Sequence, residues 1–235
     1  MTASPRLLLA AVAALLCTAA EAHVSVLSGP VIAGNNQELT FNVPHGCSGA
    51  DTFRIEVRIP AGVTSVRPLD SMFGKAVLSK DAEGVLKSVV WTKPAADVLP
   101  GDTHLYRVSL SALLPSTPFT TLFFPTIQSC RAADGTESVV EWTAASTDHD
   151  HGGGTPPTTN PAPFVFLLPA RSPGWNKYTV DQHVHDLSVF KDAQIVWTGN
   201  TAYSANPLVL SLIEKEQGTQ VLKEIHPGTE IWVKY

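Results

Sequence analysis

The sequence predicts a mainly β protein, an antiparallel β-sandwich followed by a small α+β unit. Three observations carry this prediction. Apolar and polar residues alternate from Phe53 to Ile59, which is the period of a strand with one buried face. Turn-forming pairs such as Pro100-Gly101 and Asp134-Gly135 separate short apolar segments. A clear helix-start signal, Asn206-Pro207, occurs only late in the chain.

The first unit, residues 23–143, is expected to be built from short strands. Two of them stop at Pro44 and Pro60, because proline cannot donate a hydrogen bond to a neighbouring strand. Helical periodicity is absent from this part of the sequence. Many short strands with such turns are typical of an immunoglobulin-like or cupredoxin-like sandwich. The expected strands are 39–43, 53–59, 85–91, 105–114, 120–124 and 138–143.

A flexible linker is predicted at residues 144–163, which are rich in His, Gly, Pro and Thr. The segment lacks apolar residues to bury, so we expect it to be extended and mobile. Its stretch Asp148-His149-Asp150-His151 has two interpretations, a weak metal site or a solvated linker. The second is favoured, because a flexible tetrapeptide loses entropy when it closes on an ion.

Residues 164–235 are expected to form a small α+β domain of unknown role. Strands are predicted at 164–168 and 194–197, and a closing hairpin at 221–225 and 230–234. Between them, a helix begins at Asn206-Pro207, presents Leu208, Leu212 and Ile213 on one face, and ends by Gly218. A unit of about 70 residues is marginally stable alone, which favours docking on the first unit.

Residues 1–22 have the pattern of a cleavable signal peptide. Arg6 precedes an apolar run at residues 7–17, and Ala20 and Ala22 give the small-x-small pattern of a cleavage site. Cleavage after Ala22 would place the protein in the periplasm or outside the cell. The rest of the sequence has no apolar stretch long enough for a transmembrane anchor.

Charge and cysteine content narrow the possible partners. The net charge of −5 argues against a nucleic-acid partner, which would require a basic surface. Cys47 and Cys130 follow the predicted signal, and an even pair in an exported chain is by default a disulfide. A metal site with two cysteines is the weaker alternative, because neither has a second cysteine or a histidine at ligand spacing.

Cleavage after Ala22 would make His23 the amino-terminal residue, and this residue type suggests metal chemistry. Its α-amine and ring Nδ1 are two nitrogen donors that lose their protons near pH 8 and about pH 6.5 in model peptides. A borderline cation such as Cu²⁺ can displace both protons and close a chelate ring. The alternative is that a histidine follows the cleavage site by chance.

Several short motifs occur in a characteristic order in the first unit. They are His23-Val24-Ser25-Val26, Gly34, the segments 39–44 and 52–63, Phe124-Pro125 and Val140-Glu141-Trp142. This order resembles the YcnI-like copper-binding family over about residues 23–143. Single motifs are not highly specific, and the joint pattern carries the resemblance. The tail after Thr143 lies outside it.

The resemblance implies a Cu(II) site of the type called a monohistidine brace. Matched motif by motif, the metal residues are His23, Glu56 and Trp142, with the tryptophan as a shield rather than a ligand. Cys47 and Cys130 match positions where many family members have a bridging pair. The implied role is copper trafficking, storage or homeostasis, with other copper-handling envelope proteins as partners and no catalysis.

Each of these residues has a purely structural alternative. Glu56 alternates with apolar residues and shares its strand face with Arg54 and Arg58, so it fits a solvated face with surface ion pairs. Trp142 shares a face with Val140 and fits a core position. The scarcity of sulfur ligands favours Cu(II) over Cu(I), because Met72 is the sole methionine after the predicted signal.

Two other functions remain open. An oxidative copper enzyme of the histidine-brace type needs a second histidine, and the first unit offers only His45 and His104, both in predicted turns. A non-metal adhesion or carbohydrate-binding module would use aromatic rings of the second unit, which has Trp175, Tyr178, Trp197 and Tyr203. His183 and His185 would point the same way on a strand and so could bind one ion, although a polar strand face is the more common explanation.

Overall fold

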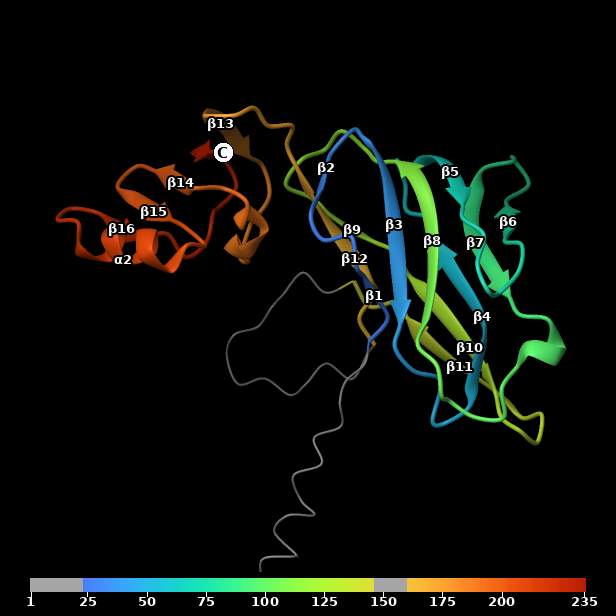
Figure 1. The fold of residues 1–235 in the computed structure, drawn as a ribbon. Coiled ribbons are helices and arrows are strands. Elements are labelled where there is room, and N and C mark those ends of the chain that lie inside the picture. The colour runs from blue at the N-terminus through green and yellow to red at the C-terminus, as the bar shows by residue number, and fades with distance from the viewer. Residues whose placement is uncertain (1–22, 146–159) are drawn as a thin grey trace, which may run out of the picture.

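The structure is a computed structural model in which residues 23–145 and 160–235 are described (Figure 1). The predicted signal peptide, residues 1–22, and the stretch Asp148-His149-Asp150-His151 lie outside the described residues. Within the described part, strands dominate and pair largely in antiparallel sheets, as the sequence predicts. In residues 23–145 and 160–235, no helix is long and apolar enough to cross a membrane.

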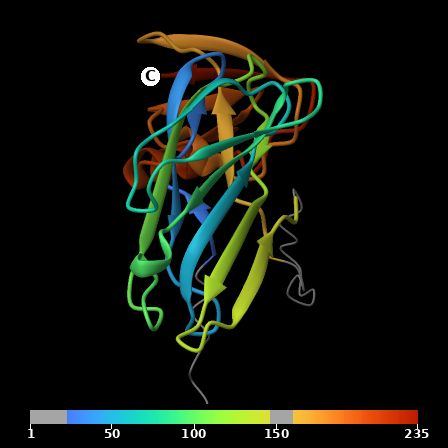
Figure 2. The same cartoon turned by 90° about the vertical axis from the view of Figure 1, so that its right-hand side faces the viewer.

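The first unit is a β-sandwich of two sheets, seen from two directions in Figures 1 and 2. The four-stranded sheet has the order β1-β3-β8-β5, and the five-stranded sheet has the order β11-β10-β4-β7-β6. The first comprises β1 (Ser25–Val26), β3 (Asn36–Val43), β8 (Tyr106–Leu113) and β5 (Thr64–Pro68). The second comprises β11 (Glu137–Trp142), β10 (Thr126–Arg131), β4 (Asp51–Arg58), β7 (Leu86–Thr92) and β6 (Val77–Lys80), with a short 3₁₀ helix at Ala95–Asp97 after β7.

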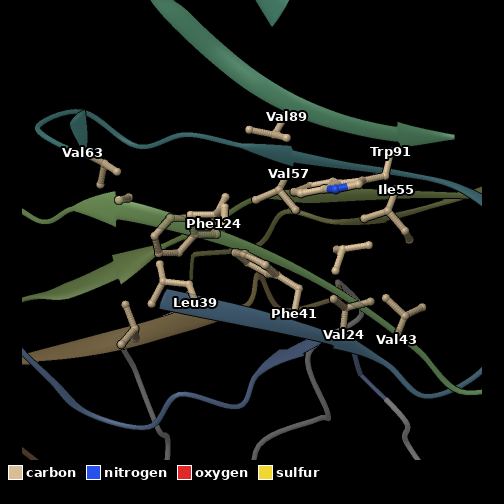
Figure 3. Close-up of a cluster of buried hydrophobic side chains, with 14 of the residues drawn as sticks. Val24, Leu39, Phe41, Val43, Ile55, Val57, Val63, Val89, Trp91 and Phe124 are labelled. Atoms are coloured by element: carbon tan, nitrogen blue, oxygen red, sulfur yellow. The ribbon is translucent and has the colours of Figure 1, made fainter. Parts of the chain in front are cut away.

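The core lies between these two sheets and follows the alternation in the sequence. Leu39 and Phe41 of β3 face Ile55 and Val57 of β4, and all four side chains are fully buried (Figure 3). Phe41 also packs edge-on against Phe124, with ring centroids 5.5 Å apart. Burial of one such side chain contributes about 1.5–3 kcal/mol, so this alternation fixes which face of each strand points inward.

A third sheet lies beside the sandwich and has the order β2-β12-β9. It comprises β2 (Val31–Ile32), β12 (Phe164–Leu168) and β9 (Thr121–Phe123). The sequence prediction assigned the strand at 164–168 to the second unit, and this assignment is wrong, because β12 pairs with two strands of the first unit. Val165 and Leu167 are buried in the core of the sandwich, which explains the pairing.

The described ends of the predicted linker are ordered by contacts with each other. Ala144 and Pro161 form an isolated bridge, and the Ala162 N–H donates to the carbonyl of Ala144 at 2.9 Å. Ala162 is buried and Pro163 accepts a hydrogen bond from the Phe124 N–H. The expectation of an extended, mobile segment is therefore wrong for Ala144 and residues 160–163, since their backbone is hydrogen-bonded and Ala162 is buried.

The second unit is a small α+β structure around a five-stranded sheet of order β13-β17-β14-β15-β16. Its strands are β13 (Trp175–Val180), β17 (Thr229–Lys234), β14 (Ile195–Thr198), β15 (Thr201–Tyr203) and β16 (Gln220–Val221). A 3₁₀ helix, Leu187–Phe190, and the helix α2, Pro207–Lys215, complete it. The predicted closing hairpin is absent from these described residues, because β17 pairs with β13 and β14 while β16 pairs with β15.

Helix α2 begins where the sequence predicts. The Asn206 side chain accepts a hydrogen bond from the Leu208 N–H at 2.9 Å, and Pro207 occupies the first turn. The predicted apolar face is only partly used. Ile213 is buried, whereas Leu208 and Leu212 are 76% and 68% exposed. Val209, Leu210 and Ser211 are half-buried, so the buried face of the helix differs from the predicted apolar stripe.

The two units are joined by a shared apolar contact. Phe119, on a loop of the first unit, belongs to the core cluster of the second and packs edge-on against Tyr178 at 5.9 Å. Leu168, the last residue of β12, is buried in the same cluster. The second unit thus docks on the first, as its small size leads us to expect.

Candidate metal centre

His23 and Trp142 meet at one edge of the sandwich. His23 immediately precedes β1, an edge strand of the four-stranded sheet, and Trp142 ends β11, an edge strand of the five-stranded sheet. The two ring centroids are 5.5 Å apart and the ring planes cross at 74°, an edge-to-face arrangement. Val24 is buried in the core, which fixes the position of the half-buried His23 beside it.

Trp142 is held by a buried glutamine that the sequence pattern does not single out. The indole N–H donates to Oε1 of Gln128 at 3.0 Å, and Nε2 of Gln128 donates to the carbonyl of His45 at 2.7 Å. Gln128 is almost completely buried. Because an indole N–H can only donate and a carbonyl can only accept, the orientation of the Gln128 amide is determined by its partners. Trp142 therefore presents its ring, not its nitrogen, to His23.

His45 lies close to the same centre. Its backbone carbonyl accepts a hydrogen bond from the Gln128 amide that also accepts from Trp142, and β3, the strand paired with β1, ends two residues before it at Val43. His45 Nδ1 lies 2.6 Å from the carbonyl of Gly46, so Nδ1 carries the proton. Nε2 of a neutral His45 then keeps its lone pair, which is the form that binds a metal. His45 lies between β3 and β4, as its predicted place in a turn leads us to expect, and its side chain is half-buried.

The predicted disulfide is confirmed and anchors the His45 turn. Cys47 and Cys130 are bonded, with their Cα atoms 5.7 Å apart. Cys130 lies on β10, two residues beyond Gln128. The backbone of Cys47 also exchanges hydrogen bonds with Ala50. The turn that carries His45 is thus tied to β10 by a covalent bond and by the Gln128 side chain.

Glu56 does not lie on the same face of the sheet as Trp142, and its role as a metal residue stays a prediction. Two neighbouring rows of paired residues run across β4, β10 and β11. One row is Glu56, Ile127 and Glu141, and the next is Val57, Thr126 and Trp142. Paired residues share a face of the sheet, and successive residues point to opposite faces. Glu56 therefore lies on the outer face, opposite to Trp142, and two strand spacings or about 10 Å away along the sheet.

The surroundings of Glu56 match the structural alternative, a strand face with ion pairs. Its Oε2 accepts a hydrogen bond from Nη2 of Arg54 at 2.7 Å. Partial burial alone raises the pKa of Glu56, but hydrogen bonds from Arg54 and Ser88 and the charges of Arg54 and Arg58 together lower it below the ordinary value. Glu56 is therefore ionised at neutral pH and paired with arginine on the outer face of β4.

The second unit holds the other candidate residues. His183 and His185 lie on the surface beside Glu224, which the sequence pattern does not connect with them. Among the aromatic residues, Tyr178 and Tyr203 pack against the core of the unit, while Trp175 and Trp197 line an open hollow with Trp232. Trp232 could have been found from the alternation in β17, where Ile231 and Val233 on either side are fully buried.

Comparisons with known proteins agree with the resemblance seen in the motifs. The model of the family described as "Domain of unknown function (DUF1775)" matches residues 23–167, past the boundary at 143 and through most of β12. YcnI-like copper-binding proteins carry this domain. No curated protein matches.

Two solved structures resemble parts of the chain. One is an uncharacterized protein from Nocardia farcinica with an immunoglobulin-like fold. The match has 28% sequence identity and a TM-score of 0.49, and it covers 63% of this chain and 99% of the Nocardia chain. The other is BcpA*(D312A), the major pilin subunit of Bacillus cereus. That match has 7% sequence identity and a TM-score of 0.35, and it covers 90% of this chain and 55% of the pilin chain. Since its family model spans more than half of the sequence, the chain belongs to the DUF1775 family.

Proposed function

We propose that this protein binds Cu²⁺ at the amino terminus created by cleavage after Ala22, as cargo for trafficking, storage or homeostasis outside the cytoplasm. The α-amine and Nδ1 of His23 would chelate the ion. The observation that carries the proposal is the contact between His23 and the Trp142 ring at the edge of the sandwich. An apolar ring on one side of the chelate would limit access of water to the bound ion.

The third donor in this proposal is His45 rather than Glu56. His45 shares Gln128 with Trp142, and its proton on Nδ1 leaves Nε2 for a metal. Nitrogen donors of this kind suit Cu²⁺. Among the described residues, neither a thiolate nor a thioether is available at the site. Cys47 and Cys130 are joined in a disulfide, and Met72 lies before β6, in the loop at the opposite edge of the sandwich. The donor set thus favours Cu(II) over Cu(I).

Three single variants separate the proposed ligands. In a Cu²⁺ titration against a competing chelator, H23A is expected to weaken binding by at least ~100-fold, because it removes an imidazole of the chelate, and H45A by ~10–100-fold. E56Q is expected to leave the affinity within about 3-fold of the parent, because Glu56 faces the other side of the sheet. To exclude copper bound by surface histidines of the second unit, all chains carry H183A/H226A. A loss in E56Q as large as that in H23A would contradict this assignment.

A second candidate function, carbohydrate binding, is favoured by the tryptophan face of the second unit. Trp175, Trp197 and Trp232 line an open hollow of ≈ 470 Å³, and Trp175 and Trp232 are 54% and 45% exposed. The register sets Trp197 directly opposite Trp232. Exposed apolar surface of this kind marks binding sites, and flat indole rings can stack on the C–H faces of sugar rings.

The tryptophan face can be tested by retention on insoluble polysaccharides without copper. W232A is expected to reduce retention by ~10-fold, because it removes the central ring of the three. The matched control is F164A, which removes a 49% exposed aromatic ring from β12 in the first unit. Equal retention of the parent, W232A and F164A would exclude this function for the face.

A further inference from the structure

Two chain segments that are distant in the sequence form a small, rigid platform on the second unit. Val184 and Ile225 form an isolated antiparallel bridge in which each N–H donates to the other's carbonyl at 2.9 Å. Both side chains are buried in the core of the unit. Because successive residues of an extended chain point in opposite directions, the residues that flank this bridge point outward. Those flanking residues are His183 and His185 on one segment and Glu224 and His226 on the other.

The three histidine side chains converge on the Glu224 carboxylate. Its Oε2 lies 3.3 Å from Nε2 of His183 and 3.3 Å from Nδ1 of His185, and its Oε1 lies 3.5 Å from Nε2 of His226. The rings of His183 and His185 have centroids 3.8 Å apart, and those of His183 and His226 are 4.6 Å apart. One potential ligand atom from each of His183, Glu224 and His226 lies within 4.8 Å of the others.

The segments on both sides are held in place by local hydrogen bonds. Asp186, next to His185, caps the 3₁₀ helix by accepting from the Ser188 N–H at 2.9 Å. On the other side, the Thr229 N–H donates to the carbonyl of His226, and the Gly228 N–H donates to the carbonyl of Val180 at 2.7 Å. The four side chains therefore project from backbone that is already ordered, which reduces the entropy lost when they close on an ion.

We propose that His183, His185, Glu224 and His226 form a binding site for a divalent borderline cation, with Zn²⁺ as the best match. Three imidazoles and one carboxylate are a donor set that Zn²⁺ uses. In a tetrahedral site with ligands at about 2.0–2.1 Å, the ligand atoms lie about 3.3–3.4 Å apart. The two nitrogen–oxygen separations to Oε2 of Glu224, 3.3 Å each, are close to that edge length, and the third, 3.5 Å, runs to the other carboxylate oxygen, Oε1.

A cluster of histidines around a carboxylate has a competing explanation, in which protonated imidazoles pair with Glu224 and no metal is involved. The two explanations predict opposite responses to acid. Protonation strengthens an imidazolium–carboxylate pair, whereas it removes the lone pairs that hold a metal. The side chains are 33% to 66% exposed, so they are accessible to a metal from solution.

The test is a Zn²⁺ titration of the processed full chain, followed by calorimetry and by the rise in melting temperature on addition of Zn²⁺. All chains carry H23A, so that the amino-terminal site does not contribute. The H183A/H226A and E224Q variants are expected to weaken Zn²⁺ binding by at least ~10–100-fold and to abolish the rise in melting temperature. The matched controls are H104A and E216Q, which remove exposed groups elsewhere and should match the parent.

Two readouts make the result decisive. Co²⁺ in place of Zn²⁺ is expected to give the intense visible absorption of a tetrahedral site, and E224Q should lose it. Circular dichroism shows whether each variant remains folded, and these surface substitutions are expected to leave the spectrum unchanged. Zn²⁺ binding that is equal in the parent, H183A/H226A and E224Q would overturn the proposal. So would a Zn²⁺ affinity that rises as the pH falls. Because this site is separate from His23, its failure would leave the copper proposal untouched.

Discussion

Replacing Lys93 by methionine is expected to lower the free energy of unfolding by about 3–5 kcal/mol, a large share of the stability of a typical domain. Lys93 and Asp51 form an ion pair of 2.7 Å in which the side chains are 2% and 0% exposed. Removing the lysine leaves the Asp51 carboxylate buried without its counter-charge. That penalty, rather than the loss of an attraction, accounts for the size of the effect.

The surroundings of the pair explain why the two charges are tolerated in the core. Asp51 also accepts hydrogen bonds from the Tyr106 hydroxyl at 2.6 Å and from the Leu99 N–H at 2.8 Å. Nζ of Lys93 lies 3.8 Å from the centroid of the Tyr106 ring and 5.1 Å from that of Phe73. Burial, and then the hydrogen bond and charge of Asp51, raise the pKa of Tyr106, so this hydroxyl remains a donor at any physiological pH.

Urea unfolding of three variants checks this prediction. K87M is the matched control, because Lys87 pairs with Asp81 at 2.9 Å but is 60% exposed, and its loss should cost less than about 1 kcal/mol. The double variant D51N/K93M removes both charges and is expected to be more stable than K93M alone. If K93M and K87M were equally stable, the buried pair would not have the role assigned to it.

Replacing both Cys47 and Cys130 by serine is expected to lower the free energy of unfolding by about 4–5 kcal/mol in the chain-entropy model. The bond closes a loop between residues 83 apart in the sequence, so its loss gives the unfolded chain much more freedom. The measurement is urea unfolding of the C47S/C130S variant against the oxidised parent.

The reduced parent serves as the control for the serine substitutions. It should unfold at about the same urea concentration as C47S/C130S, because both lack the cross-link. Oxidised and reduced parents with the same midpoint would contradict the prediction. Since the bond also anchors the turn that carries His45, the variant is expected to bind Cu²⁺ more weakly as well.

Much of the sandwich could be predicted from the sequence because its central strands bury one face. The alternation in β4 and the prolines that follow β3 and β4 located the ends of both strands to within one residue, whereas β3 and β4 begin three and two residues earlier than predicted. The strand β10 was missed, because Gln128 and Thr126 are buried polar residues and break the apolar alternation. The strand β12 was placed in the wrong unit, because strand pairing between distant segments is not encoded in the local pattern.

The site was predicted in part, for reasons that concern register. His23 and Trp142 followed from the predicted cleavage and the family resemblance, and the structure brings their rings together. The position of Glu56 relative to Trp142, two strands away, could not be predicted, because the face on which each residue lies depends on the register of both strand pairs. The cluster of His183 and Glu224 could not be predicted, since their segments meet through a single bridge far apart in the sequence.

The most direct test of the copper proposal compares two chains that differ by one residue. One begins at His23 and the other retains Ala22, so that the imidazole and every other side chain remain while the α-amine of His23 becomes an amide. Electron paramagnetic resonance with one equivalent of Cu²⁺, both chains carrying H183A/H226A, should show a defined nitrogen-coordinated site in the first chain and its loss in the second. Identical spectra from the two chains would contradict chelation at the amino terminus.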